Sequence, residues 1–366
     1  PEGATMPNFD FDNQKLHIVM FSSADTVAGQ GVGSAYQEQV KLISEGGAEY
    51  FDVDINKWNV SADIQHFHTI DPVFFLKIFN KKSVNVAYCH FLPDSLEGYL
   101  KIPKLFVPTV NNYVVAFYQA VDRLIVVNPS FIDAMVKYGI DRDKIYYIPN
   151  YVDHDAFCEQ GDDDRRKWRA KYGIKDDDFV VMACGQVHYL KGVLDFVEIA
   201  KQMPDVKFVW AGGFSFGKMT VEYDKLKEAV DNPPENVIFT GIVDRSDLVH
   251  IYNLTDVFFM PSYAEQFPMT ILEAVNLSKP LVVRSLELYE SILFDGYLKG
   301  ADNQEFIELI RSLKEDPQVY EKAVQNAQKI ADYYSKENVL KMWRAFYEDA
   351  YEEKFGVRVK EPVHEA

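Results

Sequence analysis

The sequence predicts an α/β protein made of two doubly wound halves that face one cleft, with helices at the C-terminal end. Two patterns indicate this fold. Apolar strand patterns alternate with helix patterns twice along the chain, and a polar, charged stretch without a strand pattern separates the two series. The length of 366 residues agrees with two units, because one hydrophobic core rarely extends beyond about 250 to 300 residues.

The first half begins with a strand, a loop of small residues and a helix. Residues 15–23 (KLHIVMFSS) have a buried-strand pattern, 24–35 form a glycine-rich loop, and the helix pattern over 36–47 ends at two glycines. Residues 1–14 are polar, and we expect them to be an extension outside the fold. The other elements expected in this half are strands at 48–55, 62–71 and 83–91 and a helix at 72–79.

The second half repeats the alternation after a charged stretch. We place the interdomain linker at 154–178, between an N-terminal domain over 15–153 and a C-terminal domain over 179–330. The tail, 331–366, is predicted to be helical and to pack back on the N-terminal domain, and the sequence Asp-Pro-Gln at 316–318 breaks the helical stretch before it. The expected strands are 179–186, 206–213, 237–243, 256–262 and 280–283, and the helices are 192–203, 246–255 and 269–278.

Charge and cysteine content exclude several classes of protein. The net charge of −18 argues against nucleic acid as a partner, although residues 61–150 carry nine Lys or Arg against eight Asp or Glu, so one face could approach an anionic bilayer. Three cysteines without metal-ligand spacing predict neither a disulfide framework nor a zinc site, and they fit a reducing cytoplasm. There is no secretory signal or membrane-spanning apolar run. We therefore expect a cytoplasmic protein that meets a membrane only peripherally, on its inner face.

Two glutamates follow an apolar strand in the stretch PSYAEQFPMTILEA, residues 261–274. Glu265 falls in the strand-to-helix loop and Glu273 in the helix, at the edge of an open α/β sheet where ligands bind. A carboxylate in such a loop can accept hydrogen bonds from sugar hydroxyls, and the second can hold a vicinal diol such as ribose. The alternative for both is a solvated helix face.

This strand, the Glu-x7-Glu spacing and the following Lys-Pro-Leu-Val-Val resemble the donor-site motif of the retaining glycosyltransferases of family 4. These enzymes have the GT-B fold, two Rossmann-like domains around a central cleft, with the acceptor on the N-terminal domain and the donor on the C-terminal domain. The resemblance implies a UDP-hexose donor, whose transferred hexose contacts Glu265 and whose ribose contacts Glu273.

Two further loops resemble parts of that family's donor site. GQVHYLKG (185–192) is similar to the loop Gly-Arg-Leu…Lys-Gly, in which Lys191 matches the lysine that neutralises the departing diphosphate and Gln186 stands at the arginine position. The missing charge must then come from Lys191, helix N-termini or another cation. GQGVGSA (29–35) resembles the first glycine loop, which places Gly31 and Gly33 near the donor phosphates and lacks the spacing of a dehydrogenase fingerprint.

The resemblance gives three expected catalytic residues, Glu265, Lys191 and His90, the last of which ends a strand and matches a histidine near the transferred sugar. Pro268 stands where many members have glycine, and it removes one backbone donor because proline has no N–H. The expected donor-binding residues are Gly31, Gly33, Gln186, Lys191, Glu265, Phe267, Pro268, Met269, Thr270 and Glu273.

The acceptor side suggests the substrate class. Residues 90–129 mix apolar side chains with lysines, and together with 266–293 they resemble family members that add a second hexose to glucosyl-diacylglycerol, which makes dihexosyl lipids used as glycolipid or lipoteichoic acid anchors. Plain core packing of the N-terminal domain is the alternative. The residues expected on the acceptor and membrane side are Phe91, Leu92, Lys101, Lys104 and Phe106.

No metal or other cofactor is expected. Asp52 and Asp54 form an Asp-x-Asp pair, but it lies in an early strand, and His66 and His68 have no neighbouring ligand partner in the sequence. The resemblance implies retention through front-face attack, with UDP-glucose and UDP-galactose both open as donors. Two other readings remain: a glycosyltransferase with a soluble or polysaccharide acceptor, and a non-catalytic sugar-nucleotide-binding protein.

Overall fold

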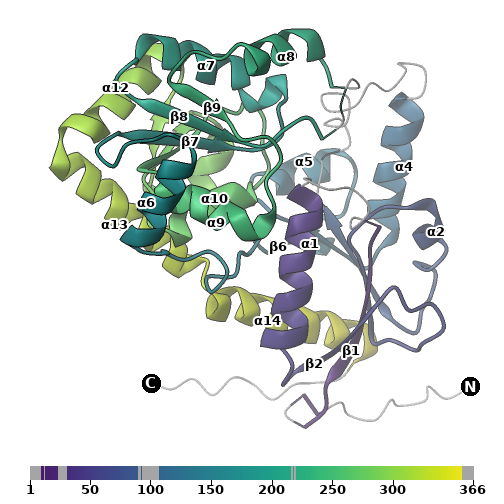
Figure 1. The fold of residues 1–366 in the computed structure, drawn as a ribbon. Helices are drawn as coiled ribbons and strands as arrows, with labels where there is room; N and C mark the ends of the chain where they lie inside the picture. The colour runs from purple at the N-terminus through teal and green to yellow at the C-terminus, as the bar shows by residue number, and fades with distance from the viewer. Residues whose placement is uncertain are drawn as a thin grey trace, which may run out of the picture.

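The protein was analysed as a computed structural model, which describes residues 10–11, 13–23, 31–89, 92, 107–215, 217 and 220–356 and, for residues 31 and 32, the backbone alone. Figure 1 shows two α/β halves, one above the other, joined by the C-terminal helices. This arrangement confirms the predicted fold class.

Each half contains one parallel sheet of six strands. In the N-terminal sheet the strand order is β2-β1-β3-β4-β5-β6, and in the C-terminal sheet it is β12-β11-β10-β7-β8-β9. All strand pairs are parallel. The strands are β1 (Leu16–Phe21), β2 (Phe51–Ile55), β3 (Ile64–Phe67), β4 (Val84–Cys89), β5 (Arg123–Val126), β6 (Ile145–Tyr147), β7 (Val180–Cys184), β8 (Lys207–Ala211), β9 (Val237–Phe239), β10 (Val257–Met260), β11 (Leu281–Arg284) and β12 (Leu298–Gly300).

Helices cover both faces of each sheet, which explains why the strands read as continuous apolar runs. The helices are α1 (Gly31–Lys41), α2 (Pro72–Phe75), α4 (Val107–Ala120), α5 (Phe131–Lys137), α6 (Asp162–Lys171), α7 (Val193–Gln202), α8 (Tyr223–Asp231), α9 (Arg245–Leu254), α10 (Met269–Asn276), α11 (Glu290–Leu293), α12 (Asn303–Glu315), α13 (Pro317–Tyr333) and α14 (Lys336–Phe355). Single turns occur at η2 (Leu42–Gly46), η4 (Arg142–Lys144), η5 (Tyr189–Lys191) and η7 (Glu287–Tyr289).

The last helix returns to the first half. In Figure 1, α14 leaves the C-terminal half and lies along the N-terminal one. Its Tyr347 hydroxyl lies 2.7 Å from Nδ1 of buried His66 in β3, and Lys354 Nζ lies 2.5 Å from Asp122 Oδ2. Within the predicted linker, α6 packs on α9 of the C-terminal half, where Arg169 donates to Asp256 at 2.9 Å. The domain boundaries themselves stay a prediction.

Three details of the element pattern differ from the sequence prediction. The helix expected over 72–79 ends at Phe75, because Leu76 and Phe79 face solvent and a second turn would bury little apolar surface. The first helix begins at Gly31, within the predicted glycine loop. The C-terminal helical stretch has a second break, where Ser335 accepts from the Asn338 amide and starts α14.

Candidate active site

The two loops that carry Lys191 and Glu265 are fastened to each other. η5 follows β7, the loop at 261–268 follows β10, and the Tyr263 amide donates to the Leu190 carbonyl at 2.7 Å. Gly192 has a φ of +75°, and a Cβ there would lie 2.5 Å from the Pro261 carbonyl oxygen. Glycine is thus required at position 192, and the close packing of the two loops that it permits brings Lys191 to Glu265.

Lys191 and Glu265 form an ion pair. Nζ of the lysine lies 2.6 Å from Oε1 of the glutamate, and their side chains are 20% and 6% exposed. A largely desolvated pair is sensitive to any new charge, because each partner loses most of its solvation. An anion that reaches this point competes with Glu265 for Lys191, and a hydroxyl-bearing ligand can donate to the carboxylate.

Glu273 lies in a second charged cluster. Its side chain is 2% exposed, and its oxygens accept from Arg245 Nη1 at 2.7 Å and from the Tyr252 hydroxyl at 2.8 Å. The other guanidinium nitrogen of Arg245 donates to Glu38 Oε1 at 2.6 Å. Each carboxylate oxygen has two lone pairs, so Glu273 keeps acceptor capacity for a ligand while its orientation is fixed.

This cluster crosses between the halves. Glu38 belongs to α1, which packs against the N-terminal sheet, whereas Arg245 begins α9 and Glu273 lies in α10. Glu38 Oε2 also accepts from the Asp153 amide at 3.0 Å, and Asp153 pairs with Lys41 at 2.5 Å. A continuous set of charged contacts therefore joins α1 to the α9–α10 corner.

Electrostatics link the two clusters at the end of β7. Burial raises the pKa of the Cys184 thiol to about 12, with Glu273 adding to the rise and with Arg245 and Lys191 opposing it. Both cations therefore act on the same strand end. For Arg245, burial alone lowers the guanidinium pKa, but Glu273 and Glu38 raise it overall, so the cation is held between them.

Two buried asparagines of the N-terminal half hold the loop that carries Glu265. Asn150 Nδ2 donates to the Phe267 carbonyl at 2.7 Å, and Asn128 Nδ2 donates to the Gln266 carbonyl at 3.0 Å. Asn128 is 0% exposed, which makes these contacts costly to break. The position of the loop therefore depends on the other half of the molecule.

The other predicted donor-site residues have mixed environments. Phe267 and Met269 bury their side chains in the core, and Pro268 precedes α10 with extended backbone. The hydroxyl of Thr270 is buried and has no hydrogen-bond partner in the part of the chain that the structure describes, an arrangement that a ligand could satisfy. Gln186 lies between β7 and η5 and is partly exposed.

Several predicted residues fall outside the described residues, namely His90, Phe91, Lys101, Lys104 and Phe106. Gly31 and Gly33 lie in the first turn of α1. Leu92 is described and packs partly buried against the core. These placements leave their proposed roles untested.

Residues considered for metal binding make internal contacts instead. Asp54 pairs with Lys57 at 2.7 Å and with His17 at 3.0 Å. The rings of His66 and His68 are buried and stack with centroids 4.3 Å apart. Over the described ranges, no three His, Cys, Asp or Glu side chains gather as a metal site.

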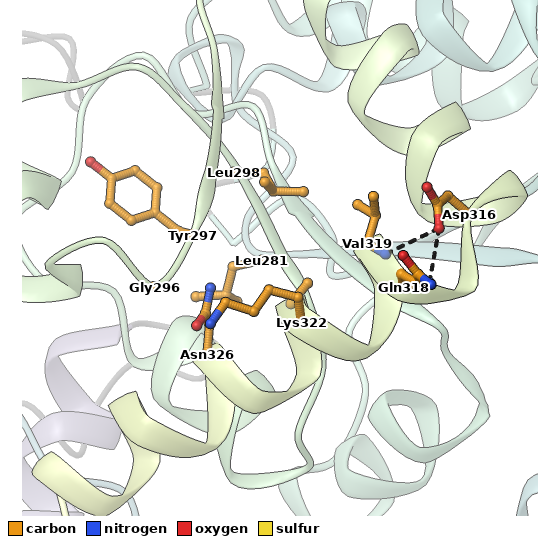
Figure 2. Close-up of a pocket in the computed structure, with 10 residues that line it drawn as sticks. Leu281, Gly296, Tyr297, Leu298, Asp316, Gln318, Val319, Lys322 and Asn326 are labelled. Carbon is orange, nitrogen blue, oxygen red and sulfur yellow. Dashed lines mark hydrogen bonds between the residues drawn. The ribbon is translucent and has the colours of Figure 1, made fainter.

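A separate hollow of about 310 Å³ lies in the C-terminal half. Figure 2 shows it between β11–β12 and the start of α13, where Asp316 accepts from the Gln318 and Val319 amides. None of the residues that line it belongs to the Lys191 or Glu273 clusters. The hollow is therefore distinct from the candidate site.

Comparison with known families decides the assignment. The family described as Glycosyltransferase Family 4 matches residues 54–156, and Glycosyl transferases group 1 matches 164–330. The alpha-galactosylglucosyldiacylglycerol synthase of Streptococcus pneumoniae is 42% identical over 92% of this chain and 90% of its own length. The chain belongs to glycosyltransferase family 4. The family 4 resemblance and the prediction of a hexosyltransferase are confirmed.

A further relative and two solved structures are also similar to this chain. The processive diacylglycerol alpha-glucosyltransferase of Acholeplasma laidlawii is 24% identical over 91% of this chain and 98% of its own. Anabaena HepE, solved with UDP and glucose, superposes with a TM-score of 0.73 at 16% identity over 91% of this chain and 99% of its own. Sucrose-phosphate synthase from Thermosynechococcus elongatus gives 0.75 at 15% identity over 93% and 100%. These structures support the fold.

Several residues of the candidate site were missed by the sequence analysis, among them Glu38, Tyr252 and Arg245. Arg245 lies 28 positions before Glu273 and 207 after Glu38, at the start of a helix where no motif marked it. The available signal was its place at the first position of a helix, after a strand of the same parallel sheet. That position alone does not distinguish it from a solvated arginine.

Proposed function

We propose that this family 4 enzyme transfers glucose or galactose from a UDP-hexose to glucosyl-diacylglycerol, with retention of the α configuration. The observation that carries the proposal is the 42% identity, over nearly the whole of both chains, to a protein named for that class of product. The similarity to two Acholeplasma laidlawii enzymes named for glucosylated diacylglycerols supports it.

The paired clusters support specific roles in binding the donor. Glu265 would accept hydrogen bonds from the hexose hydroxyls, and Glu273, held by Arg245 and Tyr252, would accept from the ribose diol. Lys191 lies beside Glu265, where it would neutralise the diphosphate. Since Gln186 is uncharged, Lys191 would provide most of the positive charge that this loop offers to the diphosphate.

In the proposed front-face reaction, the acceptor hydroxyl oxygen forms a bond to the anomeric carbon as the bond from that carbon to the β-phosphate oxygen breaks. The proton of the hydroxyl passes to the departing phosphate oxygen, so no protein nucleophile is required. Lys191 stabilises the negative charge that grows on this oxygen. Closure of the two halves around the donor excludes water, which would otherwise hydrolyse it.

We further propose that the reaction needs no metal ion and that the enzyme works as a peripheral protein on the inner face of the cell membrane. No described helix combines the length and the apolar character that crossing a bilayer requires.

A chelator should leave the rate of transfer unchanged. A rate that falls with chelator and returns with a divalent ion would contradict metal independence.

One experiment tests the proposed function directly. The protein is incubated with UDP-glucose or UDP-galactose and vesicles that contain glucosyl-diacylglycerol, and the product is identified by mass spectrometry and by its anomeric proton coupling. An α-linked dihexosyl lipid is expected. Transfer to soluble saccharides in preference to the lipid would favour a polysaccharide acceptor, and binding of UDP without any transfer would favour a non-catalytic protein.

A further inference from the structure

An exposed apolar surface lies on the N-terminal half, away from the charged clusters. We call Trp58, Val73, Leu76 and Phe79 the apolar patch. Leu76 is 76% exposed, Phe79 64% and Val73 50%. Ile55, at the end of β2, and Val60, in the same loop as Trp58, are also exposed. Figure 1 shows α2, which precedes Leu76, at the outer edge of this half, where the C-terminal half does not cover it.

Contacts fix the two segments that carry the apolar patch against each other. The Trp58 ring lies 5.5 Å from the Phe21 ring and 5.9 Å from the Phe74 ring, centroid to centroid. Lys77 Nζ donates to the Trp58 carbonyl at 2.5 Å and lies 5.0 Å from the centre of its ring. The loop after β2 and the turn after α2 are therefore fixed relative to each other. The Trp58 ring packs on Phe21 and Phe74, and the residue remains partly exposed to solvent.

The charge around the apolar patch is opposite to that of the whole chain. Residues 55–82 contain four lysines and two aspartates, whereas the chain carries −18. Both aspartates are engaged within the fold, Asp63 with the His17 amide at 2.8 Å and Asp71 with the Ser23 hydroxyl at 2.8 Å. The lysines are Lys77, Lys81 and Lys82, together with Lys57, which pairs at 2.7 Å with Asp54 just before this range.

We propose that the apolar patch and its lysines dock on an anionic lipid bilayer. An amphipathic ring such as that of Trp58 favours the boundary between headgroups and acyl chains, and exposed leucine and phenylalanine side chains gain from insertion there. Lysines beside them attract anionic headgroups. We favour a membrane over a protein partner because protruding apolar side chains can insert into a bilayer, and lysines on an otherwise acidic protein complement its negative charge.

The patch begins where a lipid acceptor would have to approach. Ile55 ends β2, and Trp58 rests on Phe21, which ends β1, so this end of the patch lies at the carboxyl edge of the sheet. Ligands of open α/β sheets bind at that edge. A bilayer seated on the patch presents a glycolipid headgroup to the cleft while the acyl chains stay in the membrane. This step rests on the proposed function, but the docking itself does not.

Trp58 gives a direct readout of docking. The other three tryptophans, Trp168, Trp210 and Trp343, are at most 6% exposed, so a change in emission on adding vesicles reports on Trp58. Vesicles of phosphatidylcholine with phosphatidylglycerol should shift the emission to the blue and float the protein, and vesicles of phosphatidylcholine alone should do so weakly. The shift should vanish in Trp58→Phe while flotation persists.

Two sets of variants test the surface against matched controls. The double variant Leu76→Ser/Phe79→Ser should lower partitioning onto phosphatidylglycerol vesicles by about tenfold or more, because two inserted side chains are lost. Val136→Ser, at an exposed valine on α5, should leave it unchanged. Lys81→Glu/Lys82→Glu should weaken binding about tenfold, whereas Lys322→Glu/Lys329→Glu, the same charge change on α13, should have little effect.

The outcomes separate docking from catalysis. Wild-type partitioning by Leu76→Ser/Phe79→Ser, or no partitioning by the wild type, would overturn the proposal. So would a concentration-dependent dimer that this variant abolishes, since a second copy would then be the occupant. Binding of UDP, measured by calorimetry, should be unchanged in every patch variant, so a failed transfer assay with intact flotation contradicts the proposed function and leaves the docking surface standing.

Discussion

The two halves of the molecule place different chemistry at their ligand-binding edges. In the C-terminal half, the strand ends carry ion pairs that are largely buried, Lys191 with Glu265 and Arg245 with Glu273. In the N-terminal half, the end of β2 leads into exposed apolar side chains and lysines. The edge of the C-terminal half suits a charged, hydroxyl-rich ligand that is held in a fixed geometry. The edge of the N-terminal half suits a membrane surface, which has an apolar interior and anionic headgroups. The difference fits the proposed reaction, in which a hexose passes from a nucleotide donor to a lipid acceptor and the nucleotide leaves.

The largest effect is expected at Glu265, and it tests whether the C-terminal edge performs the chemistry. Glu265→Gln keeps the shape but removes the charge, and kcat should fall by about 10² to 10³ while the protein stays folded. Steady-state kinetics with thermal melting measures both. Glu290→Gln, at an exposed glutamate paired with Lys299, is the control and should retain full activity. Turnover in Glu265→Gln that matches the control would remove Glu265 from the site.

A smaller effect is expected at Arg245, which joins the two edges. Arg245→Gln leaves Glu273 without its cation and should raise KM for the UDP-hexose about tenfold or more, with a smaller change in kcat, because the ribose contact is lost in ground and transition states alike. Arg245→Lys should recover part of the loss. Glu38→Gln removes only the contact to the other half.

The pair of variants separates positioning from cross-half coupling. If Arg245 acts by orienting Glu273, Glu38→Gln should bind UDP almost as well as the wild type in calorimetry. If the contact between the halves matters more, Glu38→Gln and Arg245→Gln should weaken UDP binding equally. A KM unchanged in Arg245→Gln would show that Glu273 needs no such support.

Sequence patterns marked more of the charged residues at the C-terminal edge than at the N-terminal one. Glu265, Glu273 and Lys191 stand in a spaced pattern next to apolar strands, and local backbone requirements such as the positive φ of Gly192 keep that pattern visible. Most described strands of both sheets were likewise predicted, because parallel strands buried on both faces read as apolar runs, whereas the short strands β5, β6 and β12 were not among the expected ones.

What the sequence did not predict depends on distant contacts. Arg245 gains its role from Glu38, 207 positions away, and no local pattern carries that information. Three residues of the apolar patch, Val73, Leu76 and Phe79, fall within the helix predicted over 72–79. The chain turns after Phe75 instead, which leaves Leu76 and Phe79 in solvent. Exposure of apolar residues is set by what packs over them, not by their own sequence.

The asparagine contacts test how rigidly the N-terminal half holds the other edge. Asn150→Ala removes the hydrogen bond to the Phe267 carbonyl and should lower the free energy of unfolding by about 1 to 2 kcal/mol, because a buried acceptor loses its donor. Urea denaturation measures the change. Asn232→Ala, at an exposed position whose amide donates to Glu228, should change stability by less than about 0.5 kcal/mol. Equal effects would mean that the contact between the halves contributes little.

The smallest effect concerns buried charge, which again distinguishes the halves. Near β3 the N-terminal half buries stacked histidine rings, whereas the C-terminal half buries Lys279, whose ammonium donates to the Thr255 carbonyl at 2.9 Å. Burial and the nearby Arg165 lower the pKa of Lys279 from 10.5 to about 8. The unfolded chain therefore holds this proton up to a higher pH than the folded protein does, and folding becomes more favourable as pH rises from about 8 toward 10.5.

Comparison with Lys279→Met isolates this contribution. Between pH 7 and pH 9 the wild type should gain about 1 kcal/mol of unfolding free energy relative to the variant, measured by urea denaturation at both values. Groups such as Cys184 titrate alike in both proteins, so their contributions cancel in the difference. If the difference in unfolding free energy between the two proteins stayed constant from pH 7 to pH 9, the Lys279 ammonium would keep its ordinary pKa. Burial in the C-terminal half would then destabilise the charged form of Lys279 very little.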